Sequence, residues 1–150
     1  MEGYRFTLPY IVRVADVNYG GHAANSAVLN FFQDARIAYL ARIGPYDELD
    51  IGEGCGIILP EAHVRYLAEM FLGDRLEIGV KVEEVRNSSF VMRYRIERDG
   101  EVSGEGTTSL VCFDYRARKA RRLPKTFRSA LLDFEGSEGM VNGAGGPDSF

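Results

Sequence analysis

Residues 26–43, SAVLNFFQDARIAYLARI, contain neither glycine nor proline and are followed directly by Gly44-Pro45. A glycine-proline pair after an uninterrupted, largely apolar segment is a typical helix stop, so the stretch predicts a helix of about five turns. Its polar positions Asn30, Gln33 and Asp34 form a narrow stripe, and apolar side chains cover most of the remaining surface. This pattern is typical of a helix that is buried around most of its circumference.

The segments on either side of this helix have the alternating pattern of strands. Residues 4–14 mix aromatic and β-branched side chains, and Pro9 within them indicates a sheet edge or a bulge. Downstream, alternation predicts strands within 56–67, 76–83, 90–97 and 107–113, with turn signals at Asn87-Ser88-Ser89 and Asp99-Gly100. The order of elements predicts an α+β fold in which an antiparallel sheet wraps one long buried helix.

The composition excludes several classes of protein. The chain has 150 residues, with 2 Cys and 2 His, so neither a disulfide framework nor a zinc-binding cluster is expected. Neither a nucleophile elbow nor a glycine-rich nucleotide loop occurs. No apolar run reaches the length of a membrane span and no signal peptide is visible, so we expect a cytoplasmic protein that does not bind membranes.

The charge is unevenly distributed along the chain. The formal net charge is −4, yet residues 116–128 hold seven basic side chains and no acidic one. The rest of the chain has 11 basic residues against 22 acidic ones. This basic segment can attract a small anion, whereas the protein as a whole is not expected to bind nucleic acid.

The loop between the first strand and the long helix carries the polar groups best suited to chemistry. These residues are Asp16, Asn18, Tyr19, Gly20, Gly21, His22 and Asn25. Glycine allows backbone to approach a ligand closely, and the first N–H groups of a helix lack intrahelical partners and lie at the positive end of its dipole. A carbonyl oxygen held there would be polarised, so we expect attack on an activated acyl group, with Asn25 as the helix N-cap.

The D-x-N-Y-G-G-H-x-x-N loop and the helix with Gln33-Asp34-Ala35-Arg36 resemble the hot-dog fold acyl-CoA thioesterases, in their 4-hydroxybenzoyl-CoA thioesterase-like branch. Three further motifs match in order and spacing: Gly56-Ile57-Ile58, Gly73-Asp74 and Arg122-Leu123-Pro124. The resemblance implies one hot-dog domain over residues 1–135. Residues 136–150 hold five glycines and few apolar side chains, and this composition predicts a flexible tail.

The same resemblance implies the activity and the partners. The expected reaction is hydrolysis of acyl-CoA thioesters to the free acid and coenzyme A, with no metal or redox cofactor and with coenzyme A entering only as part of the substrate. Other acyl thioesters are possible substrates. The resemblance also implies a homodimer or a homotetramer. In such an assembly the sheets join through their edges, and each site lies at a subunit interface.

Asn18 departs from the family's usual pattern. Family members commonly carry D-x-D-x-x-G here, with the second Asp as the catalytic carboxylate, and an amide can serve as neither nucleophile nor base at neutral pH. Our first choice for the base is therefore Asp16, with Asp34 and Glu61 as alternatives. Water attacks either directly, through this base, or after an acyl-enzyme intermediate. The residues assigned catalytic roles are Asp16, Asn18, His22 and Asn25.

The expected substrate contacts extend beyond the loop. They are Tyr19, Gly20, Gly21, Asp34, Glu61, Arg86 and Ser88. The turn at Arg86 and Ser88 and the basic segment 116–128 are two rival sites for the phosphates of coenzyme A, for which arginine is well suited. His63 lies on a predicted strand among apolar neighbours, so we expect it to be buried in the core or at a subunit interface.

Two other functions stay open. Asn18 motivates a hot-dog protein that binds acyl thioesters, acyl-CoA in particular, without hydrolysing them. A hot-dog dehydratase is a further alternative, although it needs a different arrangement of histidine and acid.

Overall fold

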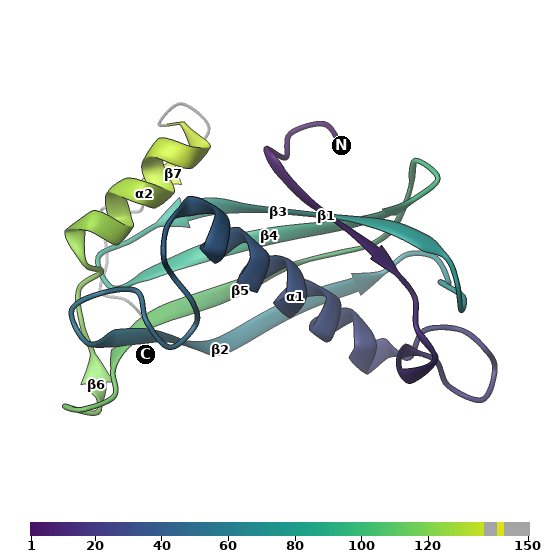
Figure 1. Cartoon of the computed structure of the whole chain (residues 1–150), viewed down its shortest axis with the longest axis horizontal. Helices are drawn as coiled ribbons and strands as arrows, with labels where there is room; N and C mark the ends of the chain where they lie inside the picture. The colour runs from purple at the N-terminus through teal and green to yellow at the C-terminus, as the bar shows by residue number, and fades with distance from the viewer. Residues whose placement is uncertain (137–140, 143–150) are drawn as a thin grey trace. The chain divides into compact units, whose positions relative to one another are not determined.

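The computed structural model describes residues 1–136 and 141–142. Figure 1 labels the elements: β1 (Phe6–Ile11), η1 (Val14–Asp16), α1 (Asn25–Ile43), β2 (Cys55–Tyr66), β3 (Arg75–Val85), β4 (Ser89–Arg98), β5 (Glu101–Asp114), β6 (Lys119–Ala120), α2 (Lys125–Glu135) and β7 (Val141–Asn142). The expected long helix is present as α1, and the five expected strands are present as β1 to β5. Most of the expected tail, 136–150, lies outside the described residues, so a domain boundary at residue 135 stays a prediction.

The strands form one sheet with the order β1-β3-β4-β5-β2, to which β6 and β7 add short pairings with β5 and β3. β1 pairs antiparallel with β3, with Phe6 opposite Val80 and Ile11 opposite Arg75. Pro9 therefore lies on an edge strand, as expected, because proline has no backbone N–H to donate to a neighbouring strand. The predicted Asp99-Gly100 turn is confirmed, with φ of 52° and 81° at its two residues. No helix within residues 1–136 and 141–142 is long and apolar enough to span a bilayer.

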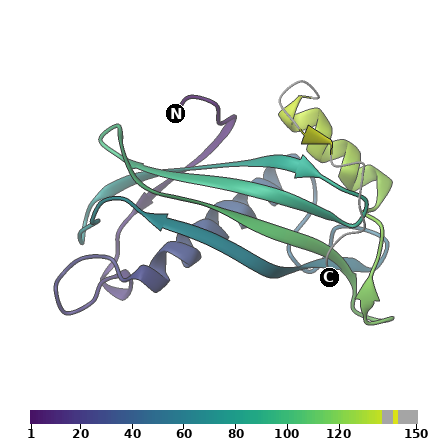
Figure 2. The same ribbon diagram turned by 180° about the vertical axis from the view of Figure 1, so that it is seen from behind.

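The chain divides into two compact units, and the strands contribute to both. The first comprises Met1–Ala38, His63–Lys81 and Arg93–Thr107, and the second comprises Tyr39–Ala62, Val82–Met92 and Thr108–Phe150. In the first unit, α1 follows one face of the strands, as the two opposite views show (Figures 1 and 2).

Aromatic stacking joins helix and sheet in the first unit. Phe32 of α1 stacks on Tyr94 of β4 with ring centroids 4.4 Å apart and an interplanar angle of 13°. Arg36, only 4% exposed, donates from its guanidinium to the Tyr94 hydroxyl at 3.0 Å. A buried charge needs such hydrogen-bond partners, so this contact fixes the rotation of the helix over the strands.

The expected burial of α1 on most of its circumference is wrong for the single chain. In the first unit, the side facing the sheet is buried at Ala27, Val28, Phe31, Phe32 and Ala35. The opposite side is exposed and includes two large apolar side chains, Leu29 at 43% and Ile37 at 44%. The sheet of one chain covers only one side of a helix, so the apolar residues on the other side remain in solvent.

In the second unit, α2 packs through an aromatic cluster and a carboxylate. Phe127 of α2 contacts Phe90 and Tyr46, with ring centroids 5.6 Å and 4.9 Å apart. At the other end of α2, the Glu135 carboxylate accepts hydrogen bonds from the Tyr39 hydroxyl at 2.5 Å and from the Val82 N–H at 2.9 Å. Burial and the nearby Glu135 charge raise the pKa of Tyr39 far above its usual range, so its hydroxyl remains a donor.

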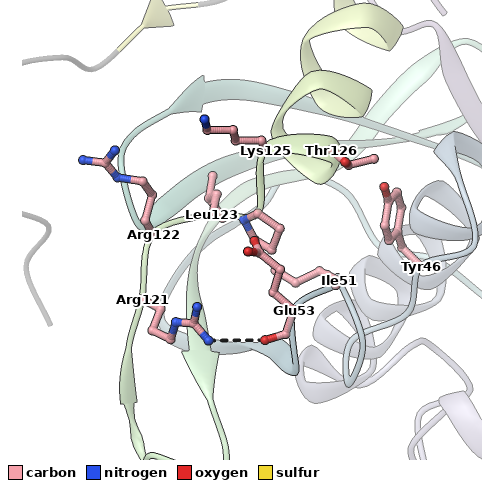
Figure 3. A pocket seen from close by; sticks show the side chains of 10 residues that line it. Tyr46, Ile51, Glu53, Arg121, Arg122, Leu123, Lys125 and Thr126 are labelled. Carbon is pink, nitrogen blue, oxygen red and sulfur yellow. Dashed lines mark hydrogen bonds between the residues drawn. The ribbon is translucent and has the colours of Figure 1, made fainter.

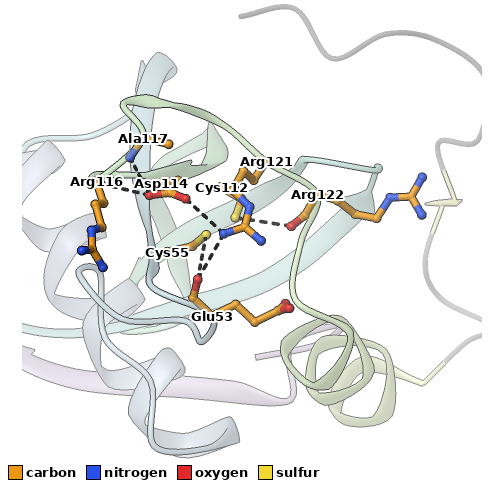
Figure 4. A network of polar contacts seen from close by, with 8 residues as sticks. All are labelled: Glu53, Cys55, Cys112, Asp114, Arg116, Ala117, Arg121 and Arg122. Carbon is orange, nitrogen blue, oxygen red and sulfur yellow. Dashed lines mark hydrogen bonds and ion pairs between the residues drawn. The ribbon is translucent and has the colours of Figure 1, made fainter.

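The two cysteines, Cys55 on β2 and Cys112 on β5, are buried neighbours in the second unit (Figure 4). Their thiols lie within hydrogen-bonding reach of the Glu53 and Arg122 carbonyl oxygens, at 3.7 Å in each case. Burial first, and then the adjacent Cys55, raise the pKa of Cys112, and Arg121 offsets only part of this effect. The Cys112 thiol is therefore protonated at neutral pH.

We expect the native chain to resist thiol labelling, because the thiolate is the reactive form and both sulfurs are buried. At pH 8, an aromatic disulfide reagent should label the folded protein at least about 100-fold more slowly than the urea-unfolded chain. Release of the reagent's chromophore measures both rates. Rapid, stoichiometric labelling of the folded protein would contradict this burial.

Candidate active site

Residues 17–23 form a small hairpin immediately before α1, here called the glycine hairpin. Val17 and Ala23 pair as an antiparallel bridge, and the Asn18 N–H donates to the His22 carbonyl oxygen at 3.1 Å. The Asn18 side chain accepts from the Gly20 N–H at 3.0 Å, closing an Asx-type turn, and Gly21 has a positive φ of 79°. Five of the expected site residues, from Asn18 to His22, thus lie in one compact turn.

Asp16 lies beside the start of α1. Its carbonyl oxygen accepts from the N–H of Ala24, the residue preceding the helix, at 2.9 Å. Its carboxylate Oδ2 accepts from the Tyr10 hydroxyl at 2.7 Å and from the Arg13 N–H at 2.8 Å. Asp16 thus also caps the short helix η1, since Oδ2 accepts a backbone N–H there. No hydrogen bond joins Oδ1 to another group among residues 1–136 and 141–142, so this oxygen can still accept a proton.

Tyr10 is a site residue that the sequence did not indicate, because no motif joins a strand tyrosine to a loop carboxylate six residues later. Its ring packs on Phe31 of α1 with centroids 4.8 Å apart, and the Arg13 guanidinium lies 5.2 Å above it. Burial, the bond to Asp16 and the charges of Asp16 and Asp34 raise the pKa of Tyr10 to about 12. Asp34, exposed on α1, is thus close enough to act on the same hydroxyl.

We also expect the backbone N–H groups of residues 21–25 to hold the oxyanion, but three of them already donate to oxygens of this chain. The N–H groups of Gly21, Ala23 and Ala24 donate to the carbonyl oxygens of Asn18, Met70 and Asp16, at 3.0, 2.6 and 2.9 Å. These three N–H groups are therefore satisfied without a ligand, as backbone N–H groups usually are in a folded protein. Of the other N–H groups, we favour those of Asn25 and Ser26, which begin α1 and have no intrahelical acceptor.

The side chains of the glycine hairpin differ in their surroundings. His22 is half-buried, packs edge-on against Phe71 with ring centroids 6.4 Å apart, and lies directly beside the backbone of Gly20. Tyr19 is fully exposed, so nothing in the single chain orients it toward a ligand. Asn25 was expected to be the N-cap, but it is the first residue of α1 and so lies one position inside the helix. Its carbonyl oxygen accepts a hydrogen bond from the Tyr66 hydroxyl at 3.2 Å.

The other expected contacts belong to the second unit. Glu61 is exposed on β2, while Arg86 and Ser88 lie in the turn between β3 and β4. The Arg86 side chain pairs with Glu84 at 2.8 Å, and the Ser88 carbonyl oxygen accepts from the Cys112 N–H at 2.8 Å. His63, in the first unit, is exposed in the single chain, so the expected core position is wrong and an interface position stays a prediction.

The two rival phosphate sites are parts of one surface. The Arg128 guanidinium donates to the Arg86 carbonyl oxygen at 2.6 Å, and the Leu123 N–H donates to the Asn87 carbonyl oxygen at 2.8 Å. Beside this surface is a cavity of about 660 Å³ lined by Tyr46, Ile51, Gly52, Glu53 and residues 121–126. In Figure 3 the Arg122 and Lys125 head groups extend to the same side, away from Tyr46.

Arg121 is committed to a structural network. Its guanidinium donates to the Asp114 carboxylate at 3.1 Å and to the Glu53 carbonyl oxygen at 3.3 Å (Figure 4). The hydrogen bond to Asp114 raises the pKa of Arg121, and the N–H groups of the turn at residues 116–117 lower the pKa of Asp114. Arg122 and Lys125 are therefore better placed than Arg121 to bind a soluble anion.

The described part of the chain holds no group of three or more His, Cys, Asp or Glu side chains arranged to bind a metal ion. The polar groups gathered at the start of α1 are instead a carboxylate, a phenol, an imidazole, an amide and helix N–H groups. This set suits proton transfer and stabilisation of a developing oxyanion.

Comparisons with known proteins agree with this chemistry. Residues 12–131 match the thioesterase-like superfamily. The acyl-CoA thioester hydrolase YbgC of Escherichia coli O6:H1 is 27% identical over 122 residues, covering 81% of this chain and 91% of YbgC. A 1,4-dihydroxy-2-naphthoyl-CoA hydrolase of Synechococcus elongatus is 23% identical over 133 residues, covering 87% of this chain and 96% of that one.

Solved structures show the same relationship. A thioesterase of Thermus thermophilus, crystallised with coenzyme A and zinc, has a TM-score of 0.80 and 30% identity, covering 91% of this chain and 98% of that one. The 1,4-dihydroxy-2-naphthoyl-CoA thioesterase Slr0204 of Synechocystis shares the fold, with a TM-score of 0.78 at 23% identity. The hot-dog resemblance is confirmed, and the chain belongs to the thioesterase-like superfamily.

Proposed function

We propose that this protein hydrolyses acyl-CoA thioesters to a free acid and coenzyme A, with Asp16 as the general base. The observation that carries the proposal is the position of Asp16, hydrogen-bonded through its backbone to the residue preceding α1, in a chain of the thioesterase-like superfamily. Relatives named acyl-CoA thioester hydrolase, and a thioesterase relative crystallised with coenzyme A, support the same substrate class.

The reaction follows from these groups. Oδ1 of Asp16 takes a proton from water as the water oxygen bonds to the thioester carbonyl carbon, and the N–H groups of Asn25 and Ser26 stabilise the resulting oxyanion. When the oxyanion collapses, the C–S bond breaks and the coenzyme A thiolate leaves, recovering a proton from Asp16 or from water. Asn18 and His22 orient the water and the thioester.

We further propose that the phosphates of coenzyme A bind the surface formed by the β3–β4 turn and the exposed residues Arg122 and Lys125. Replacing both residues with alanine should raise KM for an acyl-CoA about 30-fold, because each lost charge-assisted contact costs roughly 1 kcal/mol and the two together cost about 2 kcal/mol. KM for an N-acetylcysteamine thioester, which has no phosphate, should not change. Steady-state kinetics with both substrates measure the difference.

The matched control is Arg65→Ala, which removes an exposed arginine from the first unit, where its side chain is 71% exposed. This variant should keep the KM of the wild type for both substrates. An equal rise of KM for the two substrates in the Arg122→Ala/Lys125→Ala variant would contradict phosphate binding at this surface.

We propose that the enzyme is a homodimer or a homotetramer. Leu29 and Ile37 are exposed on α1, and β2, the last strand of the sheet order, exposes Leu59. Open strand edges and large exposed apolar side chains are each normally covered in solution. Light scattering across a concentration series measures the assembly, and a monomer at micromolar concentration would contradict it.

A direct assay tests the function. Purified protein is incubated with short, long and aromatic acyl-CoAs, and release of free thiol is followed. Turnover of at least one acyl-CoA, saturable and above the uncatalysed rate, is the expected result. Asn18 favours one rival function, a protein that binds acyl thioesters without hydrolysing them. Binding of these esters in calorimetry, together with hydrolysis of none of them, would establish that rival.

A further inference from the structure

The glycine hairpin has little support of its own. Its two internal backbone bonds, from Asn18 N–H to His22 and from Gly21 N–H to Asn18, are 3.1 and 3.0 Å long. Residues 18–21 are exposed to solvent. An isolated two-stranded hairpin is marginally stable in water, so groups outside it must hold it against the start of α1.

Residues 70–72 provide this support. The Ala23 N–H donates to the Met70 carbonyl oxygen at 2.6 Å, and the Leu72 N–H donates to the Gly21 carbonyl oxygen at 3.3 Å. His22 and Phe71 pair as an antiparallel bridge, and their rings meet edge to face with an interplanar angle of 78°. The position of the hairpin therefore depends on the conformation of the 70–72 segment.

Asp74 and Arg98 fix that segment. Oδ2 of Asp74 accepts from the Phe71 N–H at 2.7 Å and from the Arg98 guanidinium at 2.9 Å. The same guanidinium donates to the Glu69 carbonyl oxygen at 3.3 Å and lies 5.9 Å from the Phe71 ring centroid. One ion pair thus holds the backbone on both sides of Met70 and one face of the aromatic ring that His22 contacts.

Asp74 is charged under the conditions of an assay. The hydrogen bond from the Phe71 N–H, followed by the hydrogen bond and charge of Arg98, lower its pKa, against an opposing effect of burial. The charged carboxylate accepts both hydrogen bonds at neutral pH, and protonation in acid would weaken them.

We propose that Asp74 and Arg98 are positioning residues of the thioesterase reaction, which hold His22 and the glycine hairpin at the start of α1 through residues 70–72. The inference rests on the proposed function. Neither residue contacts the reacting atoms. Their effect passes through the backbone of the 70–72 segment to the groups that orient the thioester and the water.

Replacing Asp74 with alanine should lower kcat for acyl-CoA hydrolysis about 30- to 100-fold, because a misplacement of about 1 Å at the reacting groups costs this much. KM should change less than about threefold, since the phosphate-binding surface belongs to the second unit. Asp74→Asn retains an acceptor oxygen for the Phe71 N–H and should recover most of the activity. Arg98→Lys, which keeps the charge but loses the guanidinium fork, should fall between them.

The matched control is Glu105→Ala, which removes the partner of Arg65 from another ion pair of the first unit, with N···O of 2.6 Å. This variant should keep the wild-type kcat. A double-variant cycle with His22→Ala separates positioning from general destabilisation. The Asp74→Ala loss should shrink to less than about threefold when His22 is already alanine, because the two substitutions then remove the same effect.

The outcomes are distinct for the two proposals. A wild-type protein that hydrolyses no acyl-CoA overturns the proposed function itself. An active wild type with unchanged kcat in Asp74→Ala overturns the positioning role, as does a loss that is equally large with and without His22. If Asp74→Ala does not fold, as judged by thermal unfolding, the decision rests on Asp74→Asn and Arg98→Lys, and full kcat in Arg98→Lys would overturn the role.

Discussion

Replacing Asp16 with asparagine should lower kcat for acyl-CoA hydrolysis by about 10³-fold, because a positioned general base contributes roughly 10² to 10⁴ to such a reaction. The variant is nearly isosteric. The amide oxygen of asparagine can still accept hydrogen bonds from the Tyr10 hydroxyl and the Arg13 N–H, which bond to Asp16 at 2.7 and 2.8 Å. The loop should therefore keep its position while the proton acceptor is lost.

Tyr10 provides a second test of the same carboxylate. Because its pKa is raised to about 12, its hydroxyl is protonated across any practical assay range and acts only as a donor to Asp16. Tyr10→Phe removes this donor without removing the base. Its loss in kcat should therefore be much smaller than that of Asp16→Asn, about tenfold for one hydrogen bond to a charged group.

Steady-state kinetics on purified variants measure these losses, and Asp34→Asn and Glu61→Gln are the controls. Both controls should retain turnover within a few-fold of the wild type, if Asp16 is the base. Wild-type kcat in Asp16→Asn, together with a large loss in either control, would transfer the role of base to Asp34 or Glu61. Far-ultraviolet circular dichroism establishes that each variant is folded.

Replacing Gly106 with alanine should destabilise the fold by about 3 kcal/mol, at the upper end of what overpacking costs. A Cβ at residue 106 of β5 would fall on the backbone oxygen of His63 in β2 and lie 2.7 Å from Cε2 of Phe32 in α1. A side chain can rotate away from a new methyl group, but a strand backbone can move only by breaking its ladder. Glycine at this position therefore lets β2 and α1 approach β5 closely.

Gly104→Ala is the matched control, because Gly104 lies two residues away on the same strand. A Cβ there would lie 3.5 Å from the Arg65 carbonyl oxygen and 3.7 Å from Cδ1 of Ile96, which are ordinary contacts. Urea unfolding should give a Gly104→Ala midpoint near that of the wild type and a much lower midpoint for Gly106→Ala, at similar m-values. Equal midpoints for the two variants would contradict the close approach.

The order and type of the main elements could be predicted from the sequence, because hydrophobic period is a local property. Residues 26–43 were expected as a helix and form α1 from Asn25 to Ile43, and the alternating segments became β2 to β5. The turn at Asp99 and Gly100 has the positive φ angles that this dipeptide favours. Pro9 correctly indicated an edge strand.

The sequence was less informative about burial. Apolar residues surround most of α1, yet Leu29 and Ile37 are exposed in the single chain, because the sheet covers only one side of the helix. A sequence pattern records how apolar a helix is, not which of its neighbours belong to the same chain. The same limit applies to His63, which is exposed on β2.

The sequence alone determined that the loop over residues 16–25 resembles that of the thioesterases and that a long helix follows it. It also showed that position 18, where the family commonly has an aspartate, holds an asparagine. Only the tertiary structure placed Tyr10 on Asp16, paired the N–H groups of Gly21 and Ala23 with the carbonyl oxygens of Asn18 and Met70, and joined Asp74 and Arg98 to the 70–72 segment. It also merged the two rival phosphate sites through Arg128 and Leu123. These contacts join residues that are distant in the chain or in no common motif, and hydrophobic period carries no information about such partners.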